Sequence, residues 1–160
     1  MKRYSAIIFI KEKETNKYLL FQHRNYFMKN GRNTLSFVQG AIEDKETSRR
    51  AAYREASEET SLDKFIEYSV FKKYAKKISS GTYNCYVFNI TKIKELKQWT
   101  PFPQKKFSGE VNLRKWPTGH VWIKKNQLKE ILKKHQLVNG VAIWDLTEKF
   151  LINHWKKIFS

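Results

Sequence analysis

Cysteine and long apolar runs are both scarce in this sequence of 160 residues. Cys85 is the only cysteine, so no disulfide can form within the chain, which fits a reducing compartment. The apolar run near the N-terminus, residues 6–10, is too short for the core of a signal peptide and far too short to cross a bilayer. We therefore expect a cytoplasmic protein that has no membrane as a partner.

Acidic residues are few as well, with 15 Asp and Glu against 32 Lys and Arg, which gives a formal net charge of +17. One interpretation is a lysine-rich surface that only aids solubility. The other is a polyanionic partner such as RNA, because contacts from Lys and Arg to phosphates dominate nucleic-acid affinity. The sequence leaves both interpretations open, and it does not predict an oligomeric state.

The few acidic residues are concentrated in one region. Six of the 15 lie within 17 positions: Glu43, Asp44, Glu46, Glu55, Glu58 and Glu59. An acidic spot in a basic chain suits a metal-dependent enzyme that acts on polyphosphates. The acids can hold cations, while the basic surround attracts the anionic substrate.

Hydrophobic periodicity predicts a mixture of strands and helices. We expect strands at residues 4–11, 17–24, 35–38, 66–75, 82–90 and 120–123. We expect helices at residues 46–60, 126–135 and 142–159, and loops at residues 25–34 and 91–118. Strand pairs, a helix, further strands and then helices indicate an α/β sandwich with a mixed sheet. No repeat or linker interrupts the sequence, which predicts a single domain over residues 1–160.

The last of these helices is amphipathic. Its apolar side chains could face a partner or an acidic membrane surface, but a stripe of this kind is more often core, and we expect core packing. The stripe consists of Trp144, Phe150, Leu151, Trp155 and Ile158.

The helix expected at residues 46–60 places three glutamates on one face. Glu55, Glu58 and Glu59 are spaced i, i+3 and i+4, so their like charges repel unless a cation lies between them. Carboxylate oxygens of this kind suit Mg²⁺ or Mn²⁺ better than zinc. The alternative is a solvated acidic helix face on which Arg54 is an intrahelical partner.

The residues around these glutamates resemble the Nudix box. That box begins with a glycine, five spacers, Glu and seven spacers. It continues with Arg-Glu, an apolar residue, a spacer and Glu-Glu, and it ends with a spacer, a glycine and an apolar residue. Matching positions here are Gly40, Glu46, Arg54, Glu55, Glu58, Glu59 and Leu62. Ser61 replaces the second glycine, which normally ends the helix in a left-handed conformation. We expect strain on the order of 1 kcal/mol there and no lost metal ligand.

This resemblance implies a Nudix-type α/β/α sandwich and a hydrolase that cleaves a nucleoside diphosphate linked to another group. It implies that Glu55, Glu58 and Glu59 bind Mg²⁺ or Mn²⁺, together with a backbone carbonyl near Gly40. Arg54 is expected to orient a carboxylate, either Glu46 or Glu55. For the general base two candidates stay open: Glu58 in the box, and Glu110 in a later loop. His23, Arg24 and Gln39 are expected to face the substrate.

Charge is the main guide to the substrate. Residues 37–40, Phe-Val-Gln-Gly, are similar to a segment of RNA pyrophosphohydrolases and dinucleoside polyphosphate hydrolases, with Val38 in place of proline. We favour the 5′ end of RNA, with a triphosphate or a cap, or a dinucleoside polyphosphate, because lysine pairs and aromatics could track and stack RNA. Alternatives are sanitising of oxidised free nucleotides and a non-catalytic RNA-binding protein of the same fold. The lysine pairs lie at residues 72–73, 76–77, 105–106 and 124–125, with Arg114-Lys115, and the aromatics are Tyr74, Trp99, Phe102, Phe107 and Trp116.

Overall fold

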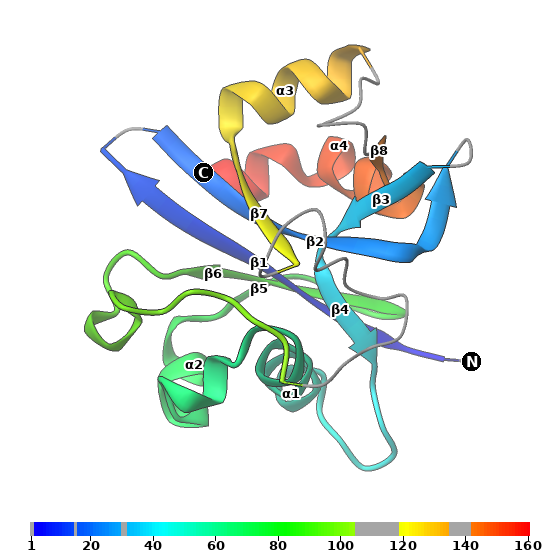
Figure 1. Ribbon diagram of the computed structural model, residues 1–160. Helices are drawn as coiled ribbons and strands as arrows, with labels where there is room; N and C mark the ends of the chain where they lie inside the picture. The colour runs from blue at the N-terminus through cyan, green and yellow to red at the C-terminus, as the bar shows by residue number, and fades with distance from the viewer. Residues whose placement is uncertain (1, 15, 30–31, 105–118, 135–141) are drawn as a thin grey trace.

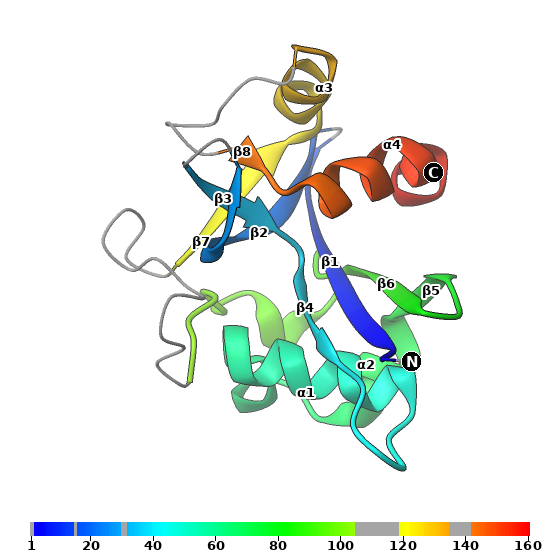
Figure 2. The ribbon, with the colours of Figure 1, turned by 90° about the vertical axis from the view of Figure 1, so that its right-hand side faces the viewer.

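The computed structural model describes residues 2–14, 16–29, 32–104, 119–134 and 142–160. In these residues a mixed sheet of eight strands lies between two helical layers, α1 with α2 on one face and α3 with α4 on the other (Figures 1 and 2). This arrangement confirms the predicted sandwich. The strands are β1 (Tyr4–Lys13), β2 (Asn16–Lys29), β3 (Arg32–Ser36), β4 (Val38–Ala41), β5 (Lys76–Ser79), β6 (Tyr83–Asn89), β7 (His120–Lys124) and β8 (Ala142–Ile143). The helices are α1 (Ser48–Thr60), α2 (Tyr68–Tyr74), α3 (Lys125–Lys134) and α4 (Asp145–Phe159), with 3-10 helices η1 (Leu62–Lys64) and η2 (Lys94–Leu96).

Strand β1 lies at the centre of the sheet. It pairs in parallel with β6 along one side, and antiparallel with both β4 and β2 along the other. β4 pairs with the first half of β1, where Ile7 is opposite Val38, and β2 pairs with the second half, where Ile10 is opposite Leu19. The sheet therefore opens between β2 and β4, and α1 contacts both β4 and β1.

Two apolar cores fill the two sides of the sheet, because successive side chains of a strand point to opposite faces. In β2, Leu19 and Phe21 belong to the core beneath α3 and α4, whereas Leu20 belongs to the core beneath α1 and α2. From α4, Leu151 and Ile158 are buried in the first of these cores. The prediction that the stripe of the final helix is core is therefore confirmed for these two residues.

Helix α1 ends at Thr60, as predicted, and begins at Ser48, two residues later than predicted. Thr47 is the N-cap, and its hydroxyl accepts a hydrogen bond of 3.1 Å from the Arg50 amide. Ala52 and Ala56 are fully buried, and their small side chains let the helix lie close to the sheet. Ser61 ends the helix at φ 60°, ψ 30°, the left-handed conformation that the box normally gives to glycine.

The prediction of a strand over residues 66–75 is wrong. This stretch contains α2, and the strand that pairs with β6 is β5. Phe71 explains the helix, because its fully buried ring contacts Phe88 of β6 and Tyr53 of α1. Aromatic residues favour strands only where they fit a half-buried pleated surface, and here tertiary packing overrides that preference.

The loop expected at residues 25–34 is also wrong for most of its length, because β2 extends to Lys29 and β3 begins at Arg32. The final predicted helix starts late. Residues 142–143 form β8, which pairs in parallel with β3, and α4 begins at Asp145. Within the described ranges, no helix has both the length and the apolar character that a membrane crossing requires.

Candidate active site

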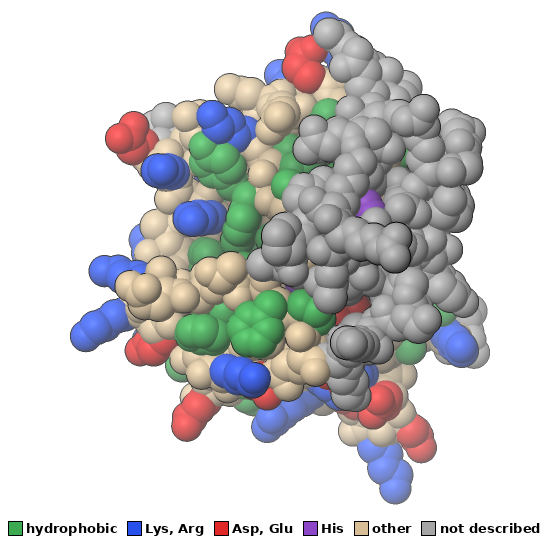
Figure 3. Space-filling view, viewed as in Figure 1, with side chains coloured by type: hydrophobic (Ala, Val, Ile, Leu, Met, Phe, Trp, Pro, Cys, Tyr) green, Lys and Arg blue, Asp and Glu red, His purple; other side chains and the backbone are tan. Residues whose placement is uncertain are grey.

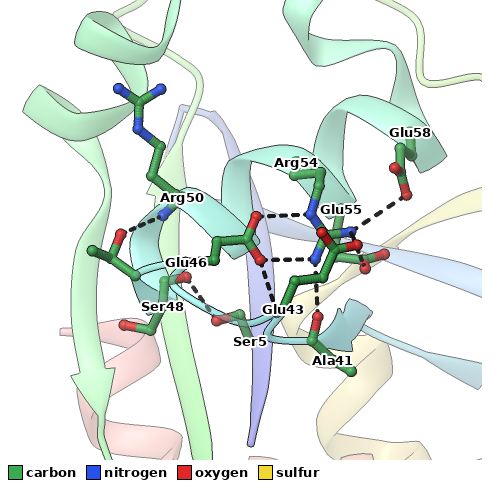
Figure 4. Close-up of polar contacts among 10 residues, drawn as sticks. Ser5, Ala41, Glu43, Glu46, Ser48, Arg50, Arg54, Glu55 and Glu58 are labelled. Atoms are coloured by element: carbon green, nitrogen blue, oxygen red, sulfur yellow. Dashed lines mark hydrogen bonds and ion pairs between the residues drawn. The ribbon is translucent and has the colours of Figure 1, made fainter.

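One arginine of α1 contacts several acidic side chains of the box (Figure 4). The Nη1 atom of Arg54 donates to Glu55 Oε1 at 2.8 Å and lies 3.7 Å from Glu58 Oε2. Its Nη2 atom donates to the carbonyl oxygen of Ala41 at 2.9 Å, which joins α1 to the end of β4. Arg54 thus fixes the helix, the strand and the acidic side chains relative to one another.

Glu46 is the partner that Arg54 holds most completely. Nε of Arg54 donates to Oε2 at 2.8 Å, and Nη2 donates to Oε1 at 3.0 Å, a paired geometry that adds direction as well as strength. The backbone amide of Glu43 also donates to Oε1, at 3.0 Å. These hydrogen bonds, chiefly those from Arg54, hold the pKa of Glu46 below its ordinary value despite partial burial. Glu46 in turn raises the pKa of Arg54, so both groups stay charged.

Gly40 and Glu55 meet where β4 passes α1. The Glu55 carboxylate lies in the space that a Cβ atom at position 40 would occupy. No other residue type can therefore stand at position 40 without displacing Glu55. This close approach gives the first glycine of the box a physical reason that is separate from backbone conformation.

Glu58 and Glu59 lie side by side in sequence but differ in exposure. The side chain of Glu58 is 26% exposed. Glu59 is only 2% exposed. A buried carboxylate is costly unless hydrogen bonds or a cation offset the lost hydration. Glu58 is therefore the better placed of the two to exchange protons with water or substrate.

The C-terminal end of α1 is held by the segment at residues 99–104. The indole nitrogen of Trp99 donates to the carbonyl oxygen of Thr60 at 2.9 Å. The backbone amide of Gln104 donates to the backbone carbonyl oxygen of Glu58 at 2.8 Å. Ser61 Oγ donates to the carbonyl oxygen of Phe102 at 2.7 Å. Serine thus makes a contact that glycine could not, which offsets part of its left-handed strain.

The donor set fits a hard divalent cation such as Mg²⁺ or Mn²⁺. The Glu55 carboxylate lies against Gly40, and Glu58 and Glu59 follow on the same helix, so α1 offers three carboxylates as oxygen ligands. Among the described residues, no three His, Cys, Asp or Glu side chains already converge on one point. The Glu55 carboxylate instead accepts a hydrogen bond from Arg54. A cation would compete with Arg54 for Glu55, while Glu46 would still hold the guanidinium.

The expected substrate-facing residues are not all beside these glutamates. His23 is buried and lies opposite Leu35 in the sheet, on the face that α3 and α4 cover. The side chain of Gln39 also belongs to that face, where Tyr83 Oη donates to its Oε1 at 2.7 Å. Arg24 belongs to β2, but its side chain lies outside the described part of the structure, as does the whole of Glu110.

The sequence did not single out Gln22, which occupies the face of β2 that points toward α1. It follows Leu20 in the strand alternation, and its cross-strand neighbours are Ser36 in β3 and His120 in β7. Gln22 is fully buried, and no described residue hydrogen-bonds its side-chain amide. A polar residue in alternation with Leu20 was the signal that could have identified it.

A comparison with protein-family models identifies the family of this chain. The NUDIX domain model matches residues 1–136, and the chain belongs to this family. The prediction of a Nudix hydrolase is confirmed at the level of the family. A separate comparison with curated proteins found no match.

Solved structures share the fold at low sequence identity. MERS1 of T. brucei in its apo form is 14% identical with a TM-score of 0.56, over 81% of this chain and 60% of that one. The Nudix hydrolase RenU of M. smegmatis is 14% identical with a TM-score of 0.58, over 98% and 86%. A bifunctional NMN adenylyltransferase/ADP ribose pyrophosphatase of Francisella tularensis, complexed with AMP and a Mn ion, is 14% identical with a TM-score of 0.53, over 98% and 42%. This chain thus spans less than two thirds of MERS1, and at these identities the likeness concerns the fold alone.

Proposed function

We propose that this chain hydrolyses a phosphoanhydride bond of a nucleoside diphosphate-linked substrate, with Mg²⁺ or Mn²⁺ as cofactor. The favoured substrate is the 5′ end of RNA, carrying a triphosphate or a cap, or a dinucleoside polyphosphate. The observation that carries the proposal is the group of glutamates around Arg54, which joins α1, β4 and the loop before α1.

The metal ligands would be Glu55, Glu58 and Glu59, with the backbone carbonyl of Gly40. When bound, the cation supplies charge neutralisation for the phosphates and makes water a better nucleophile. Arg54 orients the ligand set, because its hydrogen bonds to Glu46 and to the Ala41 carbonyl leave its Nη1 directed at Glu55.

The general base is proposed to be Glu58 or Glu110. Glu58 is supported by its partial exposure and by its position beside the other ligands, which would let its carboxylate accept a proton from water. Glu110 stays a candidate from the sequence.

The net charge supports RNA over free nucleotides as substrate. A 5′-triphosphorylated or capped RNA is a long polyanion, whereas a free nucleotide needs few cationic contacts. Lysine pairs that could follow the RNA backbone are exposed in α2 and β5, and Lys and Arg side chains border the face in Figure 3. Among structures with this fold, T. brucei MERS1 has been solved as an RNA complex, at 14% identity, and as a GDP complex, at 15% identity.

A panel of substrates tests the proposal. Phosphate and pyrophosphate release would be measured with triphosphorylated RNA, capped RNA, diadenosine polyphosphates and free nucleotides, each at two salt concentrations. We expect RNA turnover that falls steeply with salt, while turnover of free nucleotides stays low and changes little. Preferential cleavage of oxidised free nucleotides would favour the sanitising alternative. Tight RNA binding without cleavage of any substrate would favour a non-catalytic protein.

A further inference from the structure

A pocket lined by two tryptophans lies between the sheet and the segment that holds the end of α1. We infer that this tryptophan pocket, formed by Lys11, Lys97, Trp99 and Trp122, binds one base of a single-stranded RNA. The inference deepens the proposed function, from which it takes RNA as the partner. The pocket is open to solvent and has a volume of about 230 Å³.

The two rings give the pocket its shape. Trp122 of β7 and Trp99 have ring centroids 6.5 Å apart and planes at 87°, so that they form two walls of a corner. Trp99 is 7% exposed and is fixed by its hydrogen bond to Thr60, whereas Trp122 is only half-buried. Trp122 is partly exposed, and a partly exposed aromatic ring can take part in stacking with another flat ring.

Two lysines in the lining make the pocket favour a bound group that carries negative charge. Lys11 places its Nζ 5.8 Å from the centre of the Trp122 ring, and Lys97 lies exposed at the rim. Neither lysine has an ion-pair partner among the residues that the structure describes. Glu12, the one acid in the lining, lies 3.5 Å from Lys17. A cationic guest would be repelled, so the pocket suits an aromatic ring attached to an anion, and a nucleotide unit is such a group.

The size and position of the pocket favour one nucleotide of a strand. Its volume is below the range of about 300 to 1,000 Å³ typical of pockets that enclose a whole small ligand. Trp99 joins it to the end of α1, because the indole bonds to Thr60, next to Glu59. An RNA whose 5′ end lies at the glutamates could place a later base here.

Binding of a short, single-stranded RNA with a 5′-hydroxyl end tests this inference, since such a probe has no phosphoanhydride to cleave. Its affinity would be measured by fluorescence anisotropy in EDTA for the wild type and for Trp122→Leu. We expect the variant to bind between about fivefold and about 150-fold more weakly, the loss typical of removing a stacking aromatic. The matched control is Trp155→Leu, which removes a partly buried tryptophan from α4 on the other face of the sheet. It should bind like the wild type.

A second variant keeps the test independent of folding, because it changes only exposed side chains. Each phosphate contact to a single strand contributes about 0.7 to the slope of log affinity against log salt. The double variant Lys11→Gln/Lys97→Gln removes two such contacts, so the magnitude of the slope should fall by about 1.4. The exposed Lys129→Gln in α3 is its control and should leave the slope unchanged. Equal RNA affinity in the wild type and Trp122→Leu would overturn the inference. So would heparin binding that depends on Trp122 as strongly as RNA binding does, because heparin has no bases.

These outcomes separate the pocket from the proposed function. If no substrate is hydrolysed but RNA binding depends on Trp122, the proposed function fails and the pocket stands. If the wild type cleaves triphosphorylated RNA but Trp122→Leu binds the 5′-hydroxyl probe as tightly as the wild type does, the inference about the pocket is wrong and the proposed function stands.

Discussion

Arg54 and Glu46 form a two-pronged ion pair, with N–H···O distances of 2.8 and 3.0 Å, between α1 and the loop that precedes it. Glu46 binds no part of the proposed metal site itself. It keeps the guanidinium at the place where Nη1 reaches Glu55. We propose that the pair positions the proposed metal ligands, and this role can be tested apart from them.

Replacing Arg54 by lysine should lower kcat on the order of 100-fold, because an ammonium cannot bond Glu46 in a paired fashion and the ligands lose their alignment. The double variant Arg54→Lys/Glu46→Gln should lose much less activity than the sum of the losses, in free energy, of the two single variants, because both substitutions affect one interaction. Steady-state kinetics of the four proteins measure the coupling. The control is Arg49→Lys, an arginine of α1 that bonds the Ala75 carbonyl instead. Full activity in Arg54→Lys would contradict the positioning role.

The same ion pair predicts how stability changes with pH. The pKa of Glu46 is lowered in the folded chain, chiefly by the hydrogen bonds from Arg54, from an ordinary value of 4.5. A carboxylate with a lowered pKa stabilises the fold above its unfolded-state pKa, and this contribution is lost as the pH falls through the folded-state pKa. Urea unfolding should therefore show wild type more stable than Glu46→Gln at neutral pH, with the gap closing in acid. A gap that widens in acid would have the wrong sign.

Gly40→Ala should displace Glu55, because the new Cβ would overlap its carboxylate. We expect weaker Mn²⁺ binding, measured by electron paramagnetic resonance titration, and a loss of about 1 to 3 kcal/mol in the free energy of unfolding. Gly81→Ala is the comparison. Its added Cβ meets no atom within 4 Å, although φ is +103°, so it should cost stability and leave Mn²⁺ affinity unchanged. Equal Mn²⁺ affinity in Gly40→Ala and wild type would argue against Glu55 as a ligand.

Ser61 replaces a glycine at the end of α1, and its two effects on stability oppose each other. The left-handed conformation costs about 1 kcal/mol, while the hydrogen bond from Oγ to Phe102 contributes about 0.5 to 1.5 kcal/mol. Ser61→Gly should consequently be near neutral in urea unfolding. Ser61→Ala keeps the strain and loses the bond, so it should be the less stable variant. Equal stability of Ser61→Ala and the wild type would show that the bond contributes nothing. A Ser61→Ala variant more stable than Ser61→Gly would contradict the strain at this position.

Much of this site could be predicted because it is local in sequence. The spacing of Glu55, Glu58 and Glu59 and the helix end at Ser61 both depend on neighbours within one helix. Even the partners of Arg54 lie within 13 residues of it. Short-range patterns of this kind are legible in one sequence.

What the sequence could not predict depends on distant packing. The helix at α2 forms because Phe71 packs on β6 and α1, which no local pattern encodes. The face that each residue of β2 occupies depends on register, and a shift by one residue exchanges the two faces. Gln22 rather than His23 thus points toward α1. The tryptophan pocket likewise joins Trp99 and Trp122 across 23 positions of the chain, and only the fold brings them together.

The most direct measurement is phosphate and pyrophosphate release from triphosphorylated RNA by the wild type, Glu58→Gln and Glu59→Gln, each with Mg²⁺ and with EDTA. The Lys129→Gln variant serves as a control for changes in surface charge. We expect release by the wild type and the control only with Mg²⁺, and a loss on the order of 100-fold or more in both glutamate variants. Release that persists in EDTA, or that survives in both glutamate variants, would contradict a metal-dependent hydrolase built on α1.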